Sequence, residues 1–400
     1  MSNEITKEPE IRFDGYEGDW EERKVGEVFS ERSERSGEGE LISVTINSGV
    51  VKASELDRKD NSSDDKSNYK KVEVGDIAYN SMRMWQGASG YSPYNGILSP
   101  AYTVIIPKKD IDSKFFAYDF KRYDMIQTFK RNSQGLTSDT WNLKFPTLKS
   151  VKVMVPSIEE QKQISTFFES LDTTITLHQR ELDLLEQTKQ TYLKKMFPKT
   201  GEDKPEIRFA GFTDAWEQRK LGEVFQQTVE YIDPKEAGLE LWSVTVENGL
   251  TPKSERYNRE FLVKKNDKFK AIHPDEIVYN PMNMTLGSIG FNNSGKDVAV
   301  SGYYVTMKLN EGFDTKYFAT WLPSPNAINL YKLYATGSLI ERQRVQFPTL
   351  SGIKTLMPSL NEQKQIGLFF KQLDTTTALH QRELDSLKEM KKTLLQKMFV

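Results

Sequence analysis

The spacing of apolar residues is most regular in two long segments of the chain. Ten positions within residues 157–197 follow steps that alternate between four and three, and residues 359–399 repeat the same spacing. These positions are Ile164, Phe168, Leu171, Ile175, His178, Leu182, Leu185, Lys189, Tyr192 and Met196, and then Ile366, Phe370, Leu373, Thr377, His380, Leu384, Leu387, Lys391, Leu394 and Met398. This heptad pattern predicts two helices, each roughly 60 Å long at ~1.5 Å per residue, with one apolar seam apiece. Because an apolar seam needs a partner, we expect the two helices to pair as an antiparallel coiled coil with pseudo-twofold symmetry.

The ends of the first helix carry recognisable signals. Ser157 stands at the start, and Glu160 occupies the position of the reciprocal partner in a capping box. Pro198 closes the helix, because the residue before a proline disfavours the helical conformation. Two threonines at 173–174 have low helix propensity, so the sequence is compatible with a bend there.

The region before each helix alternates strand-like and helical stretches. Short runs rich in β-branched and aromatic residues end at Gly, Asn or Pro in both regions. These runs are LISVTI (41–46), DIAYN (76–80), YTVIIP (102–107), LWSVTV (241–246), EIVYN (276–280) and YYVTMKL (303–309). Residues 113–131 and 315–334 have a helical pattern, which Pro323 and Pro325 interrupt in the second stretch. The pattern predicts a mixed α/β fold of the α+β type, with the strands of each region curled into a barrel-like sheet.

The chain is a tandem duplication of two units of about 200 residues. Between the two helical segments, 26 of 41 aligned positions are identical, whereas the preceding regions agree much less. Shorter matches such as EIRF, at Glu10 and Glu206, and FPTL, at Phe145 and Phe347, keep nearly the same offset along the chain. The predicted organisation is a globular domain over 1–156, a helix over 157–197, a linker over 198–205, a second globular domain over 206–358 and a second helix over 359–400.

Composition narrows the class of protein. Apolar residues make up 37% and charged residues 28% of the 400 positions, which is typical of a folded soluble chain. Cysteine is absent, which excludes disulfides, thiol nucleophiles and thiolate metal sites and fits a reducing cytoplasm. We find no signal-peptide pattern and no run approaching the ~18 apolar residues of a membrane span, so we expect a cytoplasmic location.

Catalytic motifs are not found in the sequence. There is no G-x-x-x-x-G-K-[ST] loop for ATP, and the stretches GASG and GSIG are interpreted as turns. The stretch YNPM at Tyr279 differs from the Asn-Pro-Pro-aromatic motif of adenine methyltransferases by two residues. His178 and His380 occupy seam positions, where a buried histidine that sets helix register is favoured over a metal ligand. We therefore predict no catalytic residue, no bound metal and no cofactor.

The order of a variable region followed by a long helix, repeated once, resembles the specificity subunit of type I restriction–modification systems. The resemblance is carried by EQKQI…FF…LD and KMF in both helices, by W…RK…GEVF at the start of each unit and by FPTL…PS before each helix, and it covers essentially the whole chain. It implies that each globular region is a target-recognition domain for one half of a split sequence in double-stranded DNA. It also implies that the helices separate the half-sites and dock two modification subunits, which supply S-adenosylmethionine and methylate adenine. A restriction motor–nuclease subunit would join with ATP and Mg²⁺, and this chain would perform no chemistry.

Two strips of each globular region offer donors suited to base edges and phosphates. The turn strip follows a predicted strand, at residues 79–83 and 279–283, and the divergent strip precedes FPTL, at residues 133–144 and 336–346. The predicted DNA contacts are Tyr79, Asn80, Arg83, Trp141, Asn142, Lys144, Tyr279, Asn280, Asn283, Arg342 and Arg344. An alternative role for Asn80 and Asn280 is to cap turns. Residues 121–152 carry seven Lys or Arg and two Asp, a net charge of +5 that suits phosphate contact.

Identical positions on the helices extend beyond the apolar seam. We interpret them as docking residues for the modification subunits: Gln161, Lys162, Gln179, Arg180 and Glu181, with the copies Gln363, Lys364, Gln381, Arg382 and Glu383. Two other functions fit parts of the pattern. A coiled-coil adaptor joining two protein-binding modules would differ by showing no salt-dependent DNA binding. A self-sufficient restriction–methylation polypeptide would need a cofactor domain for which no segment remains.

Overall fold

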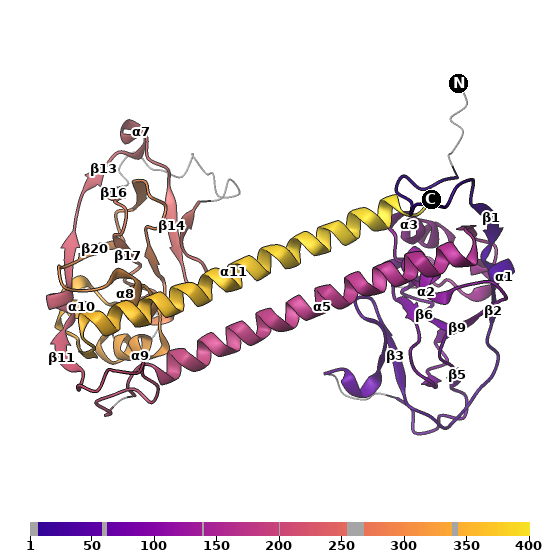
Figure 1. Cartoon of the computed structure of the whole chain (residues 1–400), viewed down its shortest axis with the longest axis horizontal. Coiled ribbons are helices and arrows are strands. Elements are labelled where there is room, and N and C mark those ends of the chain that lie inside the picture. Colours follow the sequence, from indigo (N-terminus) through magenta and orange to yellow (C-terminus); the bar gives the residue numbers. More distant parts are fainter. Residues whose placement is uncertain (1–6, 58–61, 138–139, 200, 254–267, 338–342) are drawn as a thin grey trace. The chain divides into compact units, whose positions relative to one another are not determined.

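The computed structural model describes residues 7–57, 62–137, 140–199, 201–253, 268–337 and 343–400 (Figure 1). The chain forms two compact units. The first unit comprises Met1–Gln179 and Arg382–Val400, and the second comprises Arg180–Gln381. Each unit therefore contains one globular part and one half of each long helix. Within the described ranges, no helix combines the length and hydropathy that a membrane span requires.

The two long helices are α5 (Ile158–Lys195) and α11 (Leu360–Lys397), each of 38 residues. Both lie inside the segments that the heptad pattern predicts, and all twenty seam positions are buried or half-buried. Thr173 and Thr174 do not interrupt α5. Their hydroxyls donate to the carbonyls of Glu169 (2.8 Å) and Ser170 (2.9 Å), so the helix accommodates them with i−4 hydrogen bonds.

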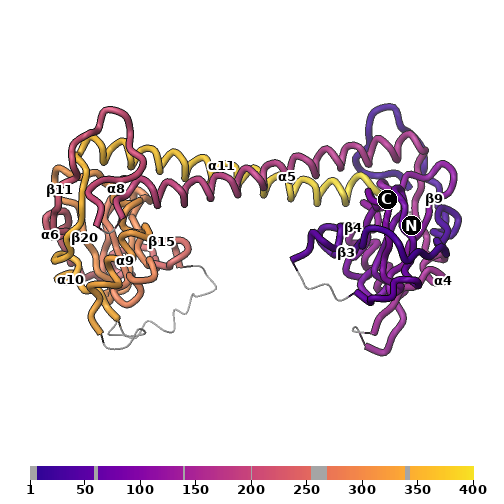
Figure 2. Tube along the Cα trace, turned by 90° about the horizontal axis from the view of Figure 1, so that it is seen from below, coloured from indigo at the N-terminus to yellow at the C-terminus, as the bar shows by residue number. Residues whose placement is uncertain are grey.

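In each unit, a half of α5 lies beside a half of α11 (Figures 1 and 2). The contacting pairs are Asp172–Lys391 and His178–Glu383 in the first unit, and Lys189–Asp374 and Tyr192–Phe369 in the second. Within each unit the residue number falls along one helix as it rises along the other. The helices are therefore antiparallel in both units, as the seam predicted.

The globular part of the first unit consists mainly of short antiparallel strands, and three short helices, α2 to α4, come near its end. Its elements are β1 (Glu21–Lys24), α1 (Val25–Val28), β2 (Phe29–Glu31), β3 (Ile42–Thr45), β4 (Gly49–Lys52), η1 (Ala53–Glu55), β5 (Lys70–Val72), β6 (Ile77–Asn80), η2 (Met84–Gln86), β7 (Ser89–Tyr91), β8 (Gly96–Leu98), β9 (Tyr102–Pro107), α2 (Ser113–Asp119), α3 (Tyr123–Asn132), α4 (Phe145–Leu148) and β10 (Lys152–Val155). The second unit repeats most of this order, with β13 and α7 added and with no counterpart of η1 among the described residues. Its elements are β11 (Glu217–Lys220), α6 (Leu221–Val224), β12 (Phe225–Thr228), β13 (Tyr231–Ile232), α7 (Pro234–Ala237), β14 (Trp242–Thr245), β15 (Gly249–Pro252), β16 (Phe269–Ile272), β17 (Ile277–Tyr279), η5 (Met284–Leu286), β18 (Ile289–Phe291), β19 (Val298–Ser301), β20 (Val305–Leu309), α8 (Thr315–Trp321), α9 (Pro325–Tyr334), α10 (Phe347–Gly352) and β21 (Lys354–Met357).

The strands form several small sheets. The largest has the order β2-β9-β6-β7 in the first unit and β12-β20-β17-β18 in the second, and strand pairs β1-β10 and β11-β21 join the start of each globular part to its end. The barrel-like sheet that we predicted is therefore not what the described strands form. Runs of two to six residues, separated by turns, pair in sheets of two, three or four strands instead of closing into one sheet.

The predicted helical stretch at 113–131 is two helices, α2 and α3. Residues 120–122 separate them; the last of these, Arg122, has an extended backbone, and its Nε donates to Asp119 Oδ1 at 2.7 Å. No proline signals this break, unlike the prolines between α8 and α9, where the predicted interruption is confirmed. The break in the first unit thus depends on a side-chain contact that helix propensity does not report.

An ion pair between a half-buried arginine and a buried glutamate joins the N-terminal segment of each unit to the start of its long helix. Arg12 bonds both carboxylate oxygens of Glu160, at 2.8 and 2.9 Å, and Arg208 does the same with Glu362, at 2.6 and 2.8 Å. The hydrogen bond with Glu160 raises the pKa of Arg12. The predicted capping box is therefore half formed. Ser157 Oγ accepts from the Glu160 backbone N–H at 3.2 Å, but the Glu160 side chain bonds Arg12.

Candidate nucleic-acid interface

The turn strip is built by a hydrogen bond from an asparagine side chain to its own turn. Asn80 ends β6, and its Oδ1 accepts from the Met82 backbone N–H at 3.0 Å. Asn280 Oδ1 accepts from Met282 N–H at 3.1 Å in the second unit. This is the turn-capping role that the sequence left open as an alternative. Each asparagine side chain therefore fixes its turn through one hydrogen bond, and the residues that follow project from that fixed turn.

Arg83 and Asn283 are exposed polar members of the turn strip, next to the exposed Met82 and Met282. Each is the residue before a short 3₁₀ helix, η2 or η5, and a glycine ends each of these helices in the left-handed conformation, Gly87 at φ 86° and Gly287 at φ 97°. The glycines are required because a side chain is strained at such angles. The two units thus present different side chains, a guanidinium and an amide, from the same backbone scaffold.

Tyr79 and Tyr279 lie in the protein core, in contrast to the predicted DNA contact. Both side chains are 0% exposed, and burial raises the pKa of each hydroxyl well above its ordinary value. The physical reason is that β6 and β17 are inner strands with both faces covered. Tyr79 packs in one apolar cluster and its neighbour Ala78 in another, so the strand has no solvent face from which a tyrosine could reach DNA.

The structure brings the turn strip and the divergent strip together in both units. The Leu143 backbone N–H donates to the Ser81 carbonyl at 2.8 Å, and the Val345 N–H donates to the Pro281 carbonyl at 2.9 Å. The divergent strip is itself closed by backbone bonds between Gln134 and Asn142, at 3.0 and 2.8 Å. Segments about 60 residues apart along the chain therefore form one continuous surface in each unit.

The divergent strip of the second unit has the same closure. Thr336 and Arg344 exchange backbone hydrogen bonds at 3.0 and 2.8 Å, and the Arg344 side chain is exposed. The predicted contact Arg342 lies outside the described residues. In the first unit Lys144 is exposed, while Trp141 and Asn142 are half-buried.

Trp85 and Lys130 belong to this surface in the first unit, although neither is among the DNA contacts predicted from the sequence. The rings of Trp85 and Trp141 meet edge to face, with centroids 5.2 Å apart, and Lys130 Nζ lies 5.8 Å from the centre of the Trp141 ring. Trp85 lies two residues after the end of the turn strip, and the second unit has Thr285 at the equivalent position. This difference between the two repeats is the feature of the sequence that could have identified Trp85 as part of the interface.

The predicted docking residues divide into two groups. Gln161 and Gln363 are buried and bond their own globular parts: Gln161 Oε1 accepts from the Asp112 N–H at 2.9 Å, and Gln363 Oε1 accepts from the Asp314 N–H at 3.1 Å. Their identity in the two helices is therefore explained by attachment of the helix to its domain. The exposed group comprises Lys162, Gln179, Arg180, Glu181, Lys364, Gln381, Arg382 and Glu383.

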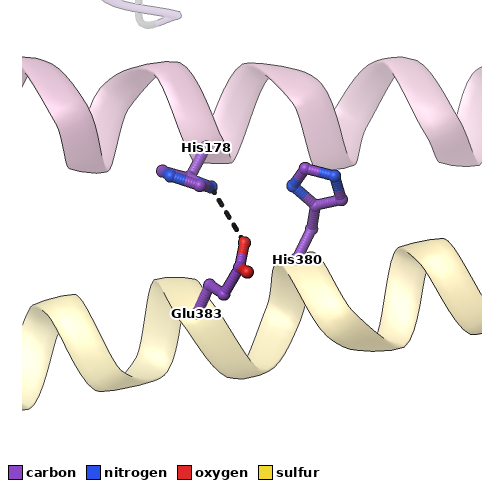
Figure 3. Close-up of side chains that lie close together, drawn as sticks. All are labelled: His178, His380 and Glu383. Carbon is purple, nitrogen blue, oxygen red and sulfur yellow. Dashed lines mark ion pairs between the residues drawn. The ribbon is translucent and has the colours of Figure 1, made fainter.

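Two of these exposed carboxylates pair with the seam histidines. His178 Nδ1 lies 3.8 Å from Glu383 Oε2 within the first unit (Figure 3), and His380 Nδ1 lies 3.3 Å from Glu181 Oε2 within the second. Both histidines are half-buried. Each therefore holds the antiparallel helix pair through an ion pair when it is protonated.

Comparison with known proteins gives consistent matches along the chain. The family model described as "Type I restriction modification DNA specificity domain" matches twice, over residues 17–187 and 213–389. A putative type I restriction enzyme MjaX specificity subunit from Methanocaldococcus jannaschii is 22% identical over 310 residues, which cover 72% of this chain and 67% of that protein. The type I restriction enzyme MjaIX specificity subunit of the same organism is 34% identical over 93 residues, 23% of this chain and 21% of the relative.

Solved structures share the fold over nearly the whole chain. The S subunit of a type I restriction–modification system from M. genitalium aligns with a TM-score of 0.58 at 15% identity, covering 98% of this chain and 99% of that one. The HsdS subunit from Thermoanaerobacter tengcongensis aligns with a TM-score of 0.50 at 17% identity, covering 99% of both chains. At these identities the structural matches establish the architecture.

Proposed function

Because this chain belongs to the family of type I restriction–modification DNA specificity domains, we propose that each of its two globular parts reads one half of a bipartite target in double-stranded DNA. The observation that supports this assignment is the shared surface formed by the turn strip and the divergent strip. In both units the same backbone bonds join the strips, at Leu143–Ser81 and Val345–Pro281. The side chains that this scaffold exposes differ between the units, as two readers of different half-sites require.

The residues of this surface divide into readers and supports. Arg83 and Arg344 are exposed cations of the kind that bonds guanine edges or phosphates, and Asn283 offers an amide suited to adenine. Lys144 of the first unit is also exposed and suits phosphate contact. Asn80 and Asn280 support the turns, and the two core tyrosines support the strands beneath.

We further propose that the chain recognises DNA for partner subunits that perform the chemistry. In this proposal two modification subunits dock on the exposed residues of α5 and α11, among them Lys162, Arg180 and Arg382. S-adenosylmethionine would be bound by those subunits, and ATP and Mg²⁺ by a restriction motor–nuclease subunit. Triple replacement of Gln179, Arg180 and Glu181 tests the docking surface. Loss of co-purification with the modification subunit, with unchanged circular dichroism, is expected, and undiminished co-purification would move the docking site elsewhere.

The modular reading is tested by exchanging globular parts. Residues 1–156 or 206–358 are replaced by the equivalent part of another specificity subunit, and methylated adenines are mapped by single-molecule sequencing in cells that carry the partners. Each exchange is expected to change one half-site and to leave the other intact. A change in both halves, or in neither, would contradict the proposal. Absence of any salt-dependent, sequence-specific DNA binding by the complex would favour an adaptor function instead.

The spacing of the half-sites provides a second test. If the helix pair sets the spacing, seven residues inserted near Thr188 in α5 and near Asp374 in α11 keep the heptad seam and lengthen the pair by about 10 Å. At ~3.4 Å per base pair, the gap between unchanged half-sites should grow by about three base pairs. An active complex with an unchanged gap would show that the partner subunits set the spacing.

A further inference from the structure

The surface of the first unit contains a rigid pair of tryptophans. Trp85 lies in η2, and its Nε1–H donates to the Met82 carbonyl at 3.0 Å, which holds the ring against the turn strip. Its ring meets that of Trp141 at 5.2 Å with an interplanar angle of 72°. Both side chains are half-buried, so each keeps an exposed portion on a scaffold that restricts its rotamers.

The backbone on both sides of Trp141 is also fixed by hydrogen bonds. Trp141 lies between Thr140 and Asn142 in the divergent strip, where Asn142 bonds Gln134 in both directions and the next residue, Leu143, bonds Ser81. Lys130 Nζ lies over the Trp141 ring at 5.8 Å. One face of this ring is therefore covered by a cation and an edge-to-face contact involves the other tryptophan, which disfavours stacking with a flipped or intercalated base.

One cation lies over this apolar pair, and two others are close to it along the chain. Arg83, two residues before Trp85, is exposed, and Lys130 and Lys144 are exposed in α3 and just before α4. These side chains suit the phosphates on either side of a groove. If these cations contact the phosphates, the tryptophans between them face the base edges. Because Trp85 Nε1–H already donates to Met82, this indole offers the edges apolar surface and no hydrogen bond.

The second unit lacks the pair, although its scaffold is the same. Thr285 and Gln343 stand at the positions of Trp85 and Trp141, and the bond between Val345 and Pro281 repeats the bond between Leu143 and Ser81. The apolar pair is thus a property of one recognition surface alone, at positions where the strips of the two units diverge.

We propose that Trp85 and Trp141 form a subsite for the C5 methyl group of a thymine in the first half-site. The assignment rests on the proposed function of the first unit as a DNA reader. The methyl group of thymine is the apolar feature that base edges display in the major groove, and apolar side chains recognise it by contact. An apolar pair accompanied by exposed cations, which are suited to phosphate contact, matches that arrangement.

Uracil substitution tests the subsite directly, because uracil is thymine without the methyl group. The half-sites are first identified from the methylated motif of the complete complex. Duplexes in which each thymine of the target is replaced in turn by uracil are then titrated with complexes that contain the unaltered chain, Trp141→Ala, Trp85→Ala or Gln343→Ala. For the unaltered chain, one replacement in the first half-site should weaken binding about fourfold, the value expected for one buried methyl group.

The tryptophan variants should lose that sensitivity, since the contact is already absent. Trp141→Ala should bind the thymine and uracil duplexes within about twofold of each other, while Gln343→Ala should keep the fourfold difference. Trp141→Phe, which retains an aromatic ring, covers the case in which the alanine variant fails to fold. Equal uracil effects in the unaltered and variant chains would overturn the subsite, as would insensitivity of every thymine in the first half-site. If the unaltered complex shows no preference for the target over unrelated DNA, that result would instead contradict the proposed function.

Discussion

The two units of this chain agree in what they bury and differ in what they expose at the candidate interface. Arg12–Glu160 and Arg208–Glu362 have the same bidentate geometry, and each pair fastens a long helix to its globular part. Asn80 and Asn280 cap equivalent turns. On those turns, however, Arg83 corresponds to Asn283. In the neighbouring 3₁₀ helices Trp85 corresponds to Thr285, and in the divergent strips Trp141 corresponds to Gln343. A scaffold whose own hydrogen bonds are satisfied internally can thus change its recognition side chains without changing its backbone.

Charged clusters away from the interface show a second kind of difference. In the first unit the buried Arg32 bonds Asp76 at 2.8 Å and Glu73 at 2.9 Å. In the second unit His273 takes the position of Glu73 and bonds Asp297 at 3.0 Å and Glu230 at 2.9 Å. One cluster therefore depends on a permanently charged guanidinium, and the other on an imidazole whose charge depends on pH.

The largest effect should come from breaking the equivalent ion pairs. Arg12→Ala leaves the carboxylate of Glu160, 1% exposed, without its cation and should lower the free energy of unfolding by roughly 3 kcal/mol. Arg208→Ala should have the same effect in the second unit. Urea denaturation measures both, and Arg12→Ala with Glu160→Ala should lose less than the sum of the single variants. A large loss in only one unit would contradict their equivalence.

The next effect concerns the exposed position of the turn. Arg83→Asn gives the first unit the side chain of the second and should cost roughly 1–3 kcal/mol of DNA affinity if Arg83 bonds a guanine edge. The methylated motif should then relax at one position of one half-site, and the reciprocal Asn283→Arg should alter only the other half-site. If both half-sites change together, the two surfaces are not independent readers.

A smaller and equal effect is expected at the turn caps. Asn80→Ala and Asn280→Ala each remove one side-chain hydrogen bond to the backbone and should cost about 1 kcal/mol of stability. DNA affinity should fall as well, because the residues after the cap lose their fixed direction. Thermal unfolding and DNA titration of the two variants measure these changes. Asp replacements, which retain the accepting oxygen, serve as matched controls and should restore most of the stability.

The smallest effect should distinguish the two charged clusters by pH. The bond with Asp297, followed by that with Glu230, raises the pKa of His273. A raised pKa means that the stabilisation is complete below about pH 6.5, the ordinary value, and is lost as the pH rises through the folded-state pKa. Because the side chain is 46% exposed, the change should stay below about 1 kcal/mol.

Urea midpoints at about pH 6 and pH 9 measure this change. His273→Gln should remove the part of the pH dependence that belongs to the second unit. Arg32 keeps its charge throughout this range, so Arg32→Gln should destabilise the first unit by a similar amount at both pH values. An unaltered pH dependence in His273→Gln would assign it to other groups.

The sequence by itself determined the elements whose pattern is local. The alternating four-and-three spacing placed α5 and α11 within a few residues of their observed bounds, and the β-rich runs placed strands such as β6, β9 and β20. The internal repeat identified the turn strip and the divergent strip as surfaces to compare. These predictions succeeded because helix and strand periods are set by neighbouring residues.

Only the tertiary structure decided which of those residues face solvent and which partners they have. Tyr79 followed a strand pattern compatible with one solvent face, but the strand is covered on both sides. Glu160 followed a capping-box pattern, yet its partner is Arg12, 148 residues away along the chain. Trp85 and Trp141 meet because Leu143 bonds Ser81, which no local spacing encodes. Burial and long-range pairing depend on how the elements pack, and the free energy of that packing is a property of the folded chain as a whole.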